Sequence, residues 1–423
     1  MDLTPANALD RTGLLLAADL HNGRISSREV IDGLRSTNAL IHATEGEVRS
    51  PAAQHVVVTL ALQLAMCGIN IELDIPDVAL VAPQPPLTES TLRSAIVAHI
   101  GLTYPWINLA PAGAPHVRYA IGATPTRSLD DIIVSGTTAS IAIGPAGSVN
   151  AKTWRGDWPI SPIAAGIAGA AEAIHTASVR TAIAAGIQPP TRPPGPARIH
   201  LNTTRIDRPQ IGEMPIVSGG AITHGTLFTL LRVPDLAGDL EVFDDDRFED
   251  TNLNRYTLLT ADQLGDLKAP SLSRWATSDL KITGNPHRYE GGERCGANRM
   301  LVGADDIAVR WRAQDDCTGW LGIGATSHLF AMVSGHTPTS PCAGCIHNHE
   351  DERPDVIPTI SIISAWAGLH LANDLLRTLD DPRPSLLWSY PLALTGQHGH
   401  LHPNHRPNVT CRRNCALSRR PAA

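Results

Sequence analysis

Residues 214–246 read MPIVSGGAITHGTLFTLLRVPDLAGDLEVFDDD, and this stretch decides the fold. MPIVSGG (214–220) has the pattern of a buried strand that ends in a glycine turn, and AITHGTLFTLLRV (221–233) has that of an amphipathic helix. DLEVFDDD (239–246) follows as a second strand that ends in acids, and RMLVGADD (299–306) repeats that form. Strands that alternate with helices indicate a doubly wound, mostly parallel α/β sheet, which binds its ligands at the carboxyl ends of its strands.

The length and the proline content divide the chain. A chain of 423 residues is too long for one ordinary core, so at least two are expected. QPPTRPPGPAR (188–198) holds five prolines in eleven residues and is the best candidate for a linker. We therefore predict an N-terminal α/β domain over 1–187, a linker over 188–197 and a C-terminal domain over 198–423 that carries the chemistry.

The first half resembles a degenerate copy of the second. Residues 50–80 show the order helix, glycine, strand and acid that residues 219–248 show again. Likewise, residues 162–177 and 360–379 are both apolar stretches that run into a helix rich in small residues. Because the first copy lacks the glycine turn, the acid cluster and the paired cysteines, it is expected to keep the fold without the site.

Composition excludes several classes of protein. The net charge of -7 gives no global basic field for nucleic acid, and no run approaches the ~18 apolar residues that a membrane span needs. The N-terminal sequence lacks the basic and apolar regions of a secretory signal. We expect a cytoplasmic protein that binds neither nucleic acid nor membrane.

The glycine turn has the geometry of a nucleotide site. Gly219 and Gly220 open a helix directly after a strand, and Asp244 follows 24 residues after Gly220 at the tip of the next strand. Backbone amides at a helix N-terminus bind phosphate, and an acid at the second strand binds ribose hydroxyls. The alternative is a turn with a purely structural role, since glycine turns at strand ends are common.

The block FDDDRFEDTNLNRY (243–256) is more specific. Three acids precede an Asn-Leu-Asn-Arg sequence, and Lys268 follows Arg255 by thirteen residues in GDLK. An arginine grips phosphate oxygens bidentately and a lysine acts as a mobile point charge, as a triphosphate requires. A solvated charged loop would explain the acids but not the order of the asparagines and the arginine.

These motifs together resemble the ThiF/MoeB/HesA family of ATP-dependent enzymes that activate ubiquitin-like proteins and sulfur carriers. The resemblance covers about residues 198–420 and implies a Rossmann-like fold. It assigns Asp244 to the ribose with Asp246 beside it, and Asn252 and Arg255 to the phosphates, with Lys268 neutralising the triphosphate. In GADDIAVR it places Asp305 at the position of the magnesium ligand and Asp306 in place of the usual asparagine. Apart from the resemblance, Asp305 is also a candidate N-cap for the helix that follows.

Two cysteine pairs indicate a structural zinc site. Cys342 and Cys345 are spaced C-x2-C, and Cys411 and Cys415 are spaced C-x3-C, which suits four thiolates around one tetrahedral ion. The family carries CxxC twice in this region. His347, His349 and the histidines of HGHLHPNH (398–405) are alternative ligands in a mixed site.

The sequence also departs from the family pattern. Ser218 and Thr223 stand where the family has the first and last glycines of GxGxxG, which crowds the phosphate loop. The stretch ERPDVIPTISI lacks the cysteine that some members use for covalent transfer, and Cys295 and Cys317 read as incidental thiols. The family also uses an arginine from a partner subunit, upstream of the glycine turn, and here the candidates are Arg198, Arg205 and Arg208.

The resemblance implies a function for the whole. We expect an ATP- and Mg²⁺-dependent adenylyltransferase, with a structural Zn²⁺, that activates the C-terminal carboxylate of a ubiquitin-like protein, a sulfur carrier or a peptide. The first half would serve as the second subunit of a pseudo-dimer, or the whole chain would form a homodimer. The alternatives are an inactive scaffold with the same fold and a nicotinamide-dependent oxidoreductase that uses the same glycine turn.

Overall fold

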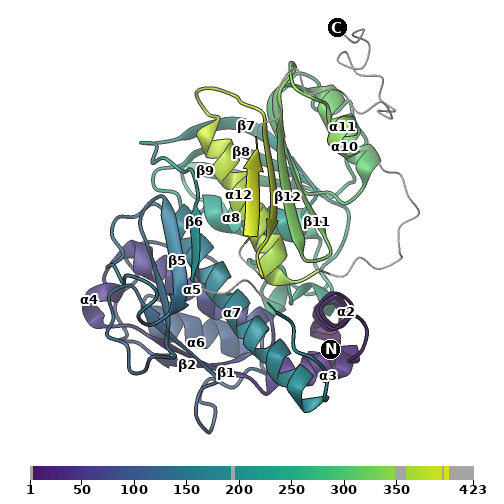
Figure 1. Cartoon of the computed structure of the whole chain (residues 1–423). Coiled ribbons are helices and arrows are strands. Elements are labelled where there is room, and N and C mark those ends of the chain that lie inside the picture. Colours follow the sequence, from purple (N-terminus) through teal and green to yellow (C-terminus); the bar gives the residue numbers. More distant parts are fainter. Residues whose placement is uncertain (1–2, 192–195, 348–358, 393–394, 400–423) are drawn as a thin grey trace, which may run out of the picture.

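The protein was analysed as a computed structural model, which describes residues 3–191, 196–347 and 359–392 and the backbone of 395–399. Within these ranges the chain forms two lobes, each built on one β-sheet (Figure 1). One buried apolar cluster runs through both lobes, so they share a core. None of the helices in the described ranges combines the length and the apolar character that crossing a membrane requires.

The N-terminal lobe is built on a six-stranded sheet in the order β2-β1-β3-β4-β5-β6. The first four of these strands run parallel, and the last two pair antiparallel. The strands are β1 (Asn38–His42), β2 (Asn70–Asp74), β3 (Val117–Ile121), β4 (Ile132–Gly136), β5 (Ser140–Pro145) and β6 (Ala197–His200).

The C-terminal lobe is built on an eight-stranded sheet in the order β14-β13-β12-β11-β10-β7-β8-β9. Strands β11, β10, β7, β8 and β9 are parallel, and β12 to β14 extend the sheet antiparallel. This arrangement confirms the predicted doubly wound, mostly parallel, Rossmann-like α/β fold. The strands are β7 (Gln210–Val217), β8 (Ala237–Phe243), β9 (Leu280–Asn285), β10 (Ala297–Val302), β11 (Cys317–Ser327), β12 (Phe330–His336), β13 (Ser385–Tyr390) and β14 (Thr395–Gly399).

Four apolar helices lie between the sheets, and small residues allow them to pack closely. A Cβ on Gly225 would lie 3.0 Å from the Ala365 Cα, and one on Gly368 would lie 2.5 Å from the Thr226 nitrogen. Gly166 has the same role against Thr59, where a Cβ would come within 2.6 Å of the threonine side chain. The alanine and glycine content therefore reflects helix packing. The four helices are α5 (Pro51–Met66), α7 (Ile160–Ala184), α8 (Ala221–Leu230) and α12 (Ser361–Arg377).

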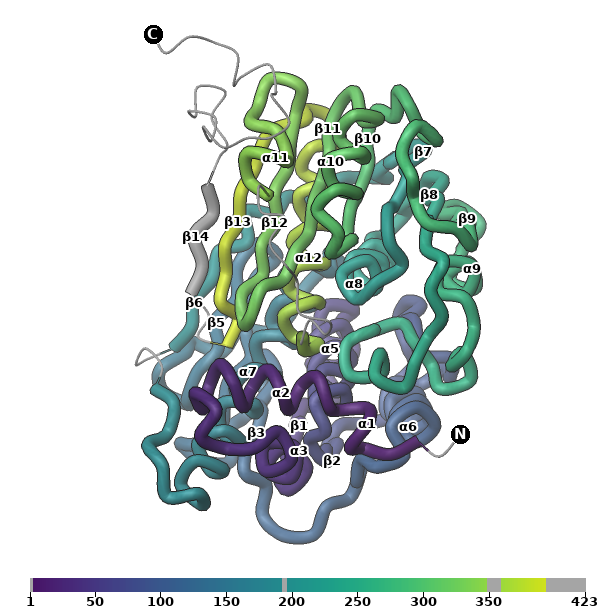
Figure 2. The backbone as a smooth tube through the Cα atoms, turned by 90° about the vertical axis from the view of Figure 1, so that its right-hand side faces the viewer, coloured from purple at the N-terminus to yellow at the C-terminus, as the bar shows by residue number. Residues whose placement is uncertain are grey.

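The remaining helices lie mainly around these layers (Figures 1 and 2). Three of them, η1, η2 and η3, are 3-10 turns in the long connection between β8 and β9. The helices are α1 (Pro5–Ala8), α2 (Asp10–Asp19), α3 (Ser27–Arg35), α4 (Glu45–Val48), α6 (Leu92–Thr103), α9 (Lys268–Leu272), α10 (Ile307–Asp316), α11 (Ala343–Ile346), η1 (Asp250–Asn252), η2 (Ala261–Gln263) and η3 (Ser273–Trp275).

The two lobes share one order of strands. β1, α5 and β2 follow each other in the first sheet as β7, α8 and β8 do in the second, and β3 lies beside β1 as β10 lies beside β7. In each lobe a long helix lies between the first antiparallel strand and the next: α7 between β5 and β6, and α12 between β12 and β13. α7 packs on α5 as α12 packs on α8. This correspondence supports the internal repeat inferred from the sequence.

The predicted division at residue 198 falls inside a strand. β6 pairs antiparallel with β5, with Arg198 opposite Ala142, so the N-terminal sheet extends to His200. Of the predicted linker, residues 188–191 form no regular element, and 192–195 lie outside the described residues. The chain therefore passes between the sheets after His200 and before Gln210, because β6 completes the first sheet beyond the prolines.

Candidate functional site

The candidate site lies where the strand order of the C-terminal sheet reverses. From β7 the chain continues through α8 to β8 on one side, whereas β10 lies on the other side of β7. Open α/β sheets bind ligands in the crevice outside such a switch point, at the carboxyl ends of the strands. A pocket of about 160 Å³ occupies this position and is lined by Val217, Ser218, Phe243, Asp244, Asp245, Asp246, Arg288, Tyr289, Ala304, Asp305, Asp306 and Val309.

The glycine turn joins β7 to α8 and is held by its own side chains. Ser218 has a φ of 83°, in the left-handed region that glycine favours. Its hydroxyl accepts a hydrogen bond from the Gly220 N–H at 3.1 Å. The Thr223 hydroxyl donates to the Ser218 carbonyl at 2.6 Å, and its side chain is buried. Thr223 therefore turns back against the strand end and does not crowd the loop as the sequence suggested.

Asp244 anchors the turn from the next strand. One of its carboxylate oxygens accepts from the Gly219 N–H at 2.7 Å, and the other accepts from the Asp246 N–H at 2.9 Å. The predicted strand over 239–246 ends at Phe243, so all three acids lie in the loop. Burial raises the pKa of Asp244, and the Lys268 ammonium partly opposes that rise. The side chain assigned to ribose thus points into the crevice.

Lys268 lies beside the turn at the start of α9. Its ammonium donates to the Asp246 carboxylate at 2.6 Å, and its Cβ would lie 3.3 Å from a Cβ on Gly219. Burial by itself would lower the pKa of Lys268, but Tyr256, Asp244 and Asp246 raise it above its ordinary value. The lysine therefore stays protonated at neutral pH within reach of the glycine turn.

The Asn-Leu-Asn-Arg block forms a buried turn. The Asn252 side chain accepts from the Glu249 N–H at 3.1 Å and so caps η1. Arg255 donates to the Thr251 carbonyl and to the Asn254 side chain, the latter at 2.7 Å. Burial lowers the pKa of Arg255 to about 10, which leaves the guanidinium charged at neutral pH. Asn252, Arg255 and Lys268 are not part of the lining of the small pocket, and Lys268 bonds to the lining residue Asp246.

Tyr256 connects the two cations, and sequence reasoning missed it. Its ring centre lies 5.3 Å from the Arg255 guanidinium carbon and 5.7 Å from the Lys268 ammonium. The ring also packs 4.7 Å from that of His224, behind the glycine turn. The sequence signal for Tyr256 was its position directly after Arg255, the arginine predicted to bind phosphate.

Another missed cation comes from the N-terminal lobe. Thr12 of α2 accepts from the Asn254 side chain at 2.9 Å, and Asn7 donates to Asp250 at 3.3 Å, which fixes α1 and α2 beside the buried turn (Figure 2). Arg11 lies close enough to Arg255 to contribute to the lowering of its pKa. The family pattern has an arginine upstream of the glycine turn. A search for such an arginine upstream of the first strand of the N-terminal half would have pointed to Arg11.

The three arginines named from the sequence lie elsewhere. Arg198 is on β6 and donates to the Ser148 carbonyl at 3.1 Å. Arg205 pairs with Asp157, on the N-terminal lobe. Arg208 precedes the amino end of β7, whereas the pocket lies at its carboxyl end, about 25 Å away across eight residues at ~3.3 Å each. Within this chain, none of the three is placed at the site.

The two aspartates after β10 have different surroundings. Asp306 caps α10, accepting from the Ala308 N–H at 2.8 Å, and pairs with Arg288 at 2.5 Å. The cap considered for Asp305 thus belongs to its neighbour. Asp305 is exposed and lines the pocket, and no residue in the described ranges bonds to its carboxylate. Arg288, which no sequence motif singled out, adds a cation to the same pocket.

The described cysteines include one candidate pair of metal ligands. The sulfurs of Cys342 and Cys345 are 3.7 Å apart, against about 3.8 Å for two thiolates at ~2.3 Å from a tetrahedral zinc. Cys411, Cys415 and His349 lie outside the described residues. His347 instead bonds to Arg310 and Ser334 through its two ring nitrogens, at 3.0 and 3.1 Å.

The other thiols in this lobe are not activated. A hydrogen bond to Asp316 raises the pKa of Cys295, and burial raises that of Cys317 to about 11. Because the thiolate is the nucleophile, a raised pKa disfavours both residues for covalent transfer.

Comparisons with known proteins return distant likenesses. No family model matches the chain. The uncharacterized protein y4jF of Sinorhizobium fredii (strain NBRC 101917 / NGR234) is 31% identical over 137 residues, 31% of this chain and 26% of that protein, so the chain spans about a quarter of this relative. E. coli MccB with ATP matches with a TM-score of 0.38 and 16% identity, over 45% of this chain and 64% of that one. E. coli MccB with MccA-N7isoASN matches at 0.39 and 15%, over 45% and 64%. These likenesses are too distant to carry an argument about activity.

Proposed function

We propose that the C-terminal lobe is an ATP- and Mg²⁺-dependent adenylyltransferase, which activates the C-terminal carboxylate of a ubiquitin-like protein, a sulfur carrier or a peptide as an acyl-adenylate. One observation carries the proposal: Gly219, Asp244, Lys268 and Asp305 converge around one switch-point crevice. These residues are the parts that the resemblance to the ThiF/MoeB/HesA family assigned to ribose, triphosphate and metal. A nicotinamide-dependent reaction would give no role to Lys268, Arg255 or Asp305.

The nucleotide would lie across the glycine turn. Asp244 lines the crevice, and its Oδ1 keeps a lone pair for the ribose hydroxyls, because within the described residues that oxygen accepts from the Asp246 N–H alone. Gly219 and Gly220 let the backbone approach the phosphates, and the N-terminus of α8 faces them. Lys268 and Arg255 flank this position with two charges that burial has already desolvated.

The reaction needs positioning and charge, and no protein nucleophile. A substrate carboxylate oxygen attacks the α-phosphorus of ATP, the bond from that phosphorus to the bridging oxygen breaks, and pyrophosphate leaves with the electron pair. Lys268 and Arg255 would neutralise the charge that develops on the phosphates. Asn252 would act through the turn that it caps, because its amide oxygen holds the Glu249 N–H.

The donor set at the strand ends fits magnesium. Asp305 offers an exposed carboxylate, and oxygens of Asp244, Asp245 and Asp246 lie within 4.8 Å of one another. Magnesium prefers one or two carboxylates together with phosphate oxygens and water. When bound, the ion would neutralise the charge on the departing pyrophosphate, and Asp305 would hold it with Asp246 nearby.

The second metal would be structural. The geometry of Cys342 and Cys345 suits two of the four thiolates of a zinc site. Cys411 and Cys415, which lie outside the described residues, are proposed as the other two ligands.

The N-terminal lobe would act as the companion in a pseudo-dimer within one chain. Its α2 brings Arg11 to the turn that holds Arg255, where a cation from a second subunit would otherwise stand. The residues whose side chains join α1 and α2 to that turn, Asn7 and Thr12, bond Asp250 and Asn254. A homodimer would not be required to complete this site.

ATP–pyrophosphate exchange tests the proposal. The probe is a pool of synthetic peptides with free, randomised C-termini, with Mg²⁺ present and ATP binding followed by calorimetry. Exchange should depend on the peptide pool and fall about a hundredfold or more in Lys268→Ala and in Asp305→Ala. Arg11→Ala should lower it about tenfold.

Matched variants separate chemistry from folding. Lys281 on β9 is exposed and lies in the same sheet, so Lys281→Ala should keep full exchange. Asp130→Ala removes an exposed aspartate of the N-terminal lobe and should also leave the rate of exchange unchanged. A chain that binds no ATP by calorimetry would be the inactive scaffold instead, with Ser218 as the residue to restore to glycine.

A further inference from the structure

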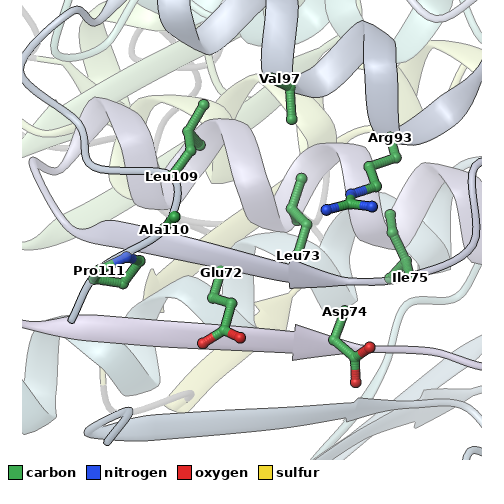
Figure 3. A pocket seen from close by; sticks show the side chains of 9 residues that line it. All are labelled: Glu72, Leu73, Asp74, Ile75, Arg93, Val97, Leu109, Ala110 and Pro111. Carbon is green, nitrogen blue, oxygen red and sulfur yellow. The ribbon is translucent and has the colours of Figure 1, made fainter. Parts of the chain in front are cut away.

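A second hollow lies in the N-terminal lobe, away from the proposed ATP site. β2 is the edge strand of its sheet, and a groove of about 390 Å³ runs between this edge and α6. Figure 3 shows the side chains around it. They are Glu72, Leu73, Asp74, Ile75, Arg93, Val97, Leu109, Ala110 and Pro111.

The register leaves backbone groups of β2 facing this groove. Asn70 donates to the Thr37 carbonyl and Asp74 accepts from the Ala43 N–H, so the even-numbered residues of β2 bond to β1 and its extension. The alternate residues face outward, and the Ile71 N–H donates to the Asn108 carbonyl on that side. Leu73 is the next outward residue, and within the described ranges no segment bonds its N–H or C=O. An open donor and acceptor on an edge strand form a template for another strand.

The helix above the groove provides two side chains at a matching spacing. Arg93 and Val97 lie four residues apart on α6, about 6 Å along the helix axis at ~1.5 Å per residue. Side chains on one face of an extended strand repeat every two residues, about 6.8 Å apart. Val97 is 40% exposed although it is apolar, and Leu73 lies below it (Figure 3). An extended chain on β2 would therefore meet an apolar contact and a cation two residues apart.

Arg93 provides a positive charge at this groove, and the nearby Asp77 carboxylate accepts from the Arg93 backbone N–H at 2.9 Å. The Arg93 guanidinium extends over the groove, and no acidic group in the described ranges pairs with it (Figure 3). Glu72 and Asp74 point to the opposite face of the strand, as the alternation of a strand requires (Figure 3). Asp74 is paired there with Arg127, and the His42 Nδ1 lies 2.8 Å from its carboxylate.

We propose that this groove binds an extended segment of a partner polypeptide, which adds as a strand beside β2. The segment presents an apolar side chain to Val97 and Leu73 and an acidic side chain, two residues away, to Arg93. Main-chain hydrogen bonds to Leu73 provide the affinity, and the two side chains provide the specificity. This interaction goes beyond the proposed adenylation and does not require ATP.

A second copy of the chain is a poor occupant. Its own β2 reads NIELD and then Ile75, so one face offers two acids two residues apart. One of these acids would face Arg93, but the other would face the apolar Val97. Its other face is Leu73 and Ile75, which are already buried in their own lobe. The pattern of one apolar and one acidic residue has to come from another polypeptide.

The test uses a yeast-displayed library of random heptapeptides selected on the full chain without nucleotide. Selected peptides should share an apolar and an acidic residue two positions apart. Binding of a labelled, soluble copy should weaken about tenfold or more in Arg93→Glu and in Val97→Asp. The matched control is Arg28→Glu, an arginine with 91% of its side chain exposed on α3, which should bind as the wild type does.

Two further readouts decide the mode of binding. Replacing the acidic residue of the peptide by lysine should restore binding to Arg93→Glu. Hydrogen exchange at the Leu73 amide should slow on binding, whereas the Glu72 and Asp74 amides, which face β1, should change little. A library that yields no binders, binders indifferent to Arg93→Glu, or a chain that dimerises in the ultracentrifuge unless Val97→Asp is present would each overturn the proposal.

Discussion

The two lobes carry the same strand order, yet their switch-point crevices differ in what fills them. In the C-terminal lobe, α8 begins directly after the glycine turn and leaves the space between β7 and β10 open. In the N-terminal lobe, α4 lies between β1 and α5 and brings Glu47 beneath the residues that follow β3. The Glu47 carboxylate accepts from the Trp154 N–H at 2.6 Å and from the Ala123 N–H at 3.3 Å. The same backbone frame therefore holds a pocket in one lobe and a buried side chain in the other.

The hydrogen bonds between adjacent strands identify the residue that replaces the ribose aspartate. Ser218 donates to the Phe243 carbonyl at 2.9 Å, and Ala43 donates to the Asp74 carbonyl at 3.3 Å. The residue after each acceptor occupies the equivalent place, so Ile75 stands where Asp244 stands. The comparison teaches that the loops at the strand ends, and not the sheet, determine whether this fold has a nucleotide site.

The largest expected effect is on ATP affinity, when Asp244 of the C-terminal lobe is replaced by isoleucine, the residue at the equivalent position 75 of the N-terminal lobe. Asp244→Ile removes the acceptor of the Gly219 N–H and the proposed ribose ligand, so ATP affinity should fall about a hundredfold. Asp244→Asn keeps one acceptor oxygen and should lose less. Calorimetry on both variants, with Ile75→Asp as the matched change in the other lobe, measures the difference. Equal ATP affinity in Asp244→Ile and the wild type would break the comparison.

A clash distinguishes the filled crevice from the open one. A Cβ on Gly122 would lie 2.0 Å from a Glu47 oxygen, at a φ of +63°, whereas one on Gly303 would lie 2.9 Å from the Thr223 hydroxyl. Gly122→Ala should therefore lower the free energy of unfolding by about 2 kcal/mol or more, and Gly303→Ala by about 1 kcal/mol. Urea denaturation measures both. In a Glu47→Ala background the loss from Gly122→Ala should shrink, and an unchanged loss would show that Glu47 does not fill the crevice.

Local features of the site could be predicted from the sequence, and tertiary ones could not. The β7–α8–β8 unit follows from hydrophobic periodicity and a glycine turn, which are local patterns. The strand predicted over 239–246 ends at Phe243, and the helix cap considered for Asp305 is made by Asp306. Such shifts of one to three residues arise because the ends of elements depend on capping geometry. Arg11 was missed because its neighbours Thr12 and Asn254 are 242 residues apart in the chain. The Glu47 side chain that fills the N-terminal crevice could not be predicted for the same reason, since its partners Trp154 and Ala123 are distant from it in the sequence.

The filled crevice should make the N-terminal lobe sensitive to pH. Burial raises the pKa of Glu47, and the Trp154 and Ala123 amides oppose that rise without cancelling it. Because the folded pKa lies above the unfolded one, the protonated form contributes stability at low pH that is lost as pH rises through the folded pKa. The free energy of unfolding should therefore fall as the pH rises from the ordinary pKa of a glutamate through the raised pKa of Glu47, and Glu47→Gln should remove that part of the slope. Denaturation curves of both proteins between pH 4 and 7.5 measure it, and parallel slopes would contradict the assignment.

The smallest expected effect concerns the strain of the glycine turn, which has no counterpart in the first lobe. Ser218 adopts a φ of 83°, whereas Ala43, at the equivalent position, is not among the residues with positive φ. Ser218→Gly should relieve about 1–2 kcal/mol of backbone strain, but glycine costs about 0.5–1 kcal/mol in conformational entropy and the bond to the Gly220 N–H is lost.

The net gain from Ser218→Gly should therefore be below about 1 kcal/mol, seen as a small rise in Tm. Ser218→Ala keeps the strain and loses the hydroxyl, so it should be less stable than the wild type. If both variants were destabilised equally, the hydroxyl would dominate over the strain. In that case Ser218 would be a functional replacement for the family glycine, because its side chain would stabilise the turn that glycine only permits.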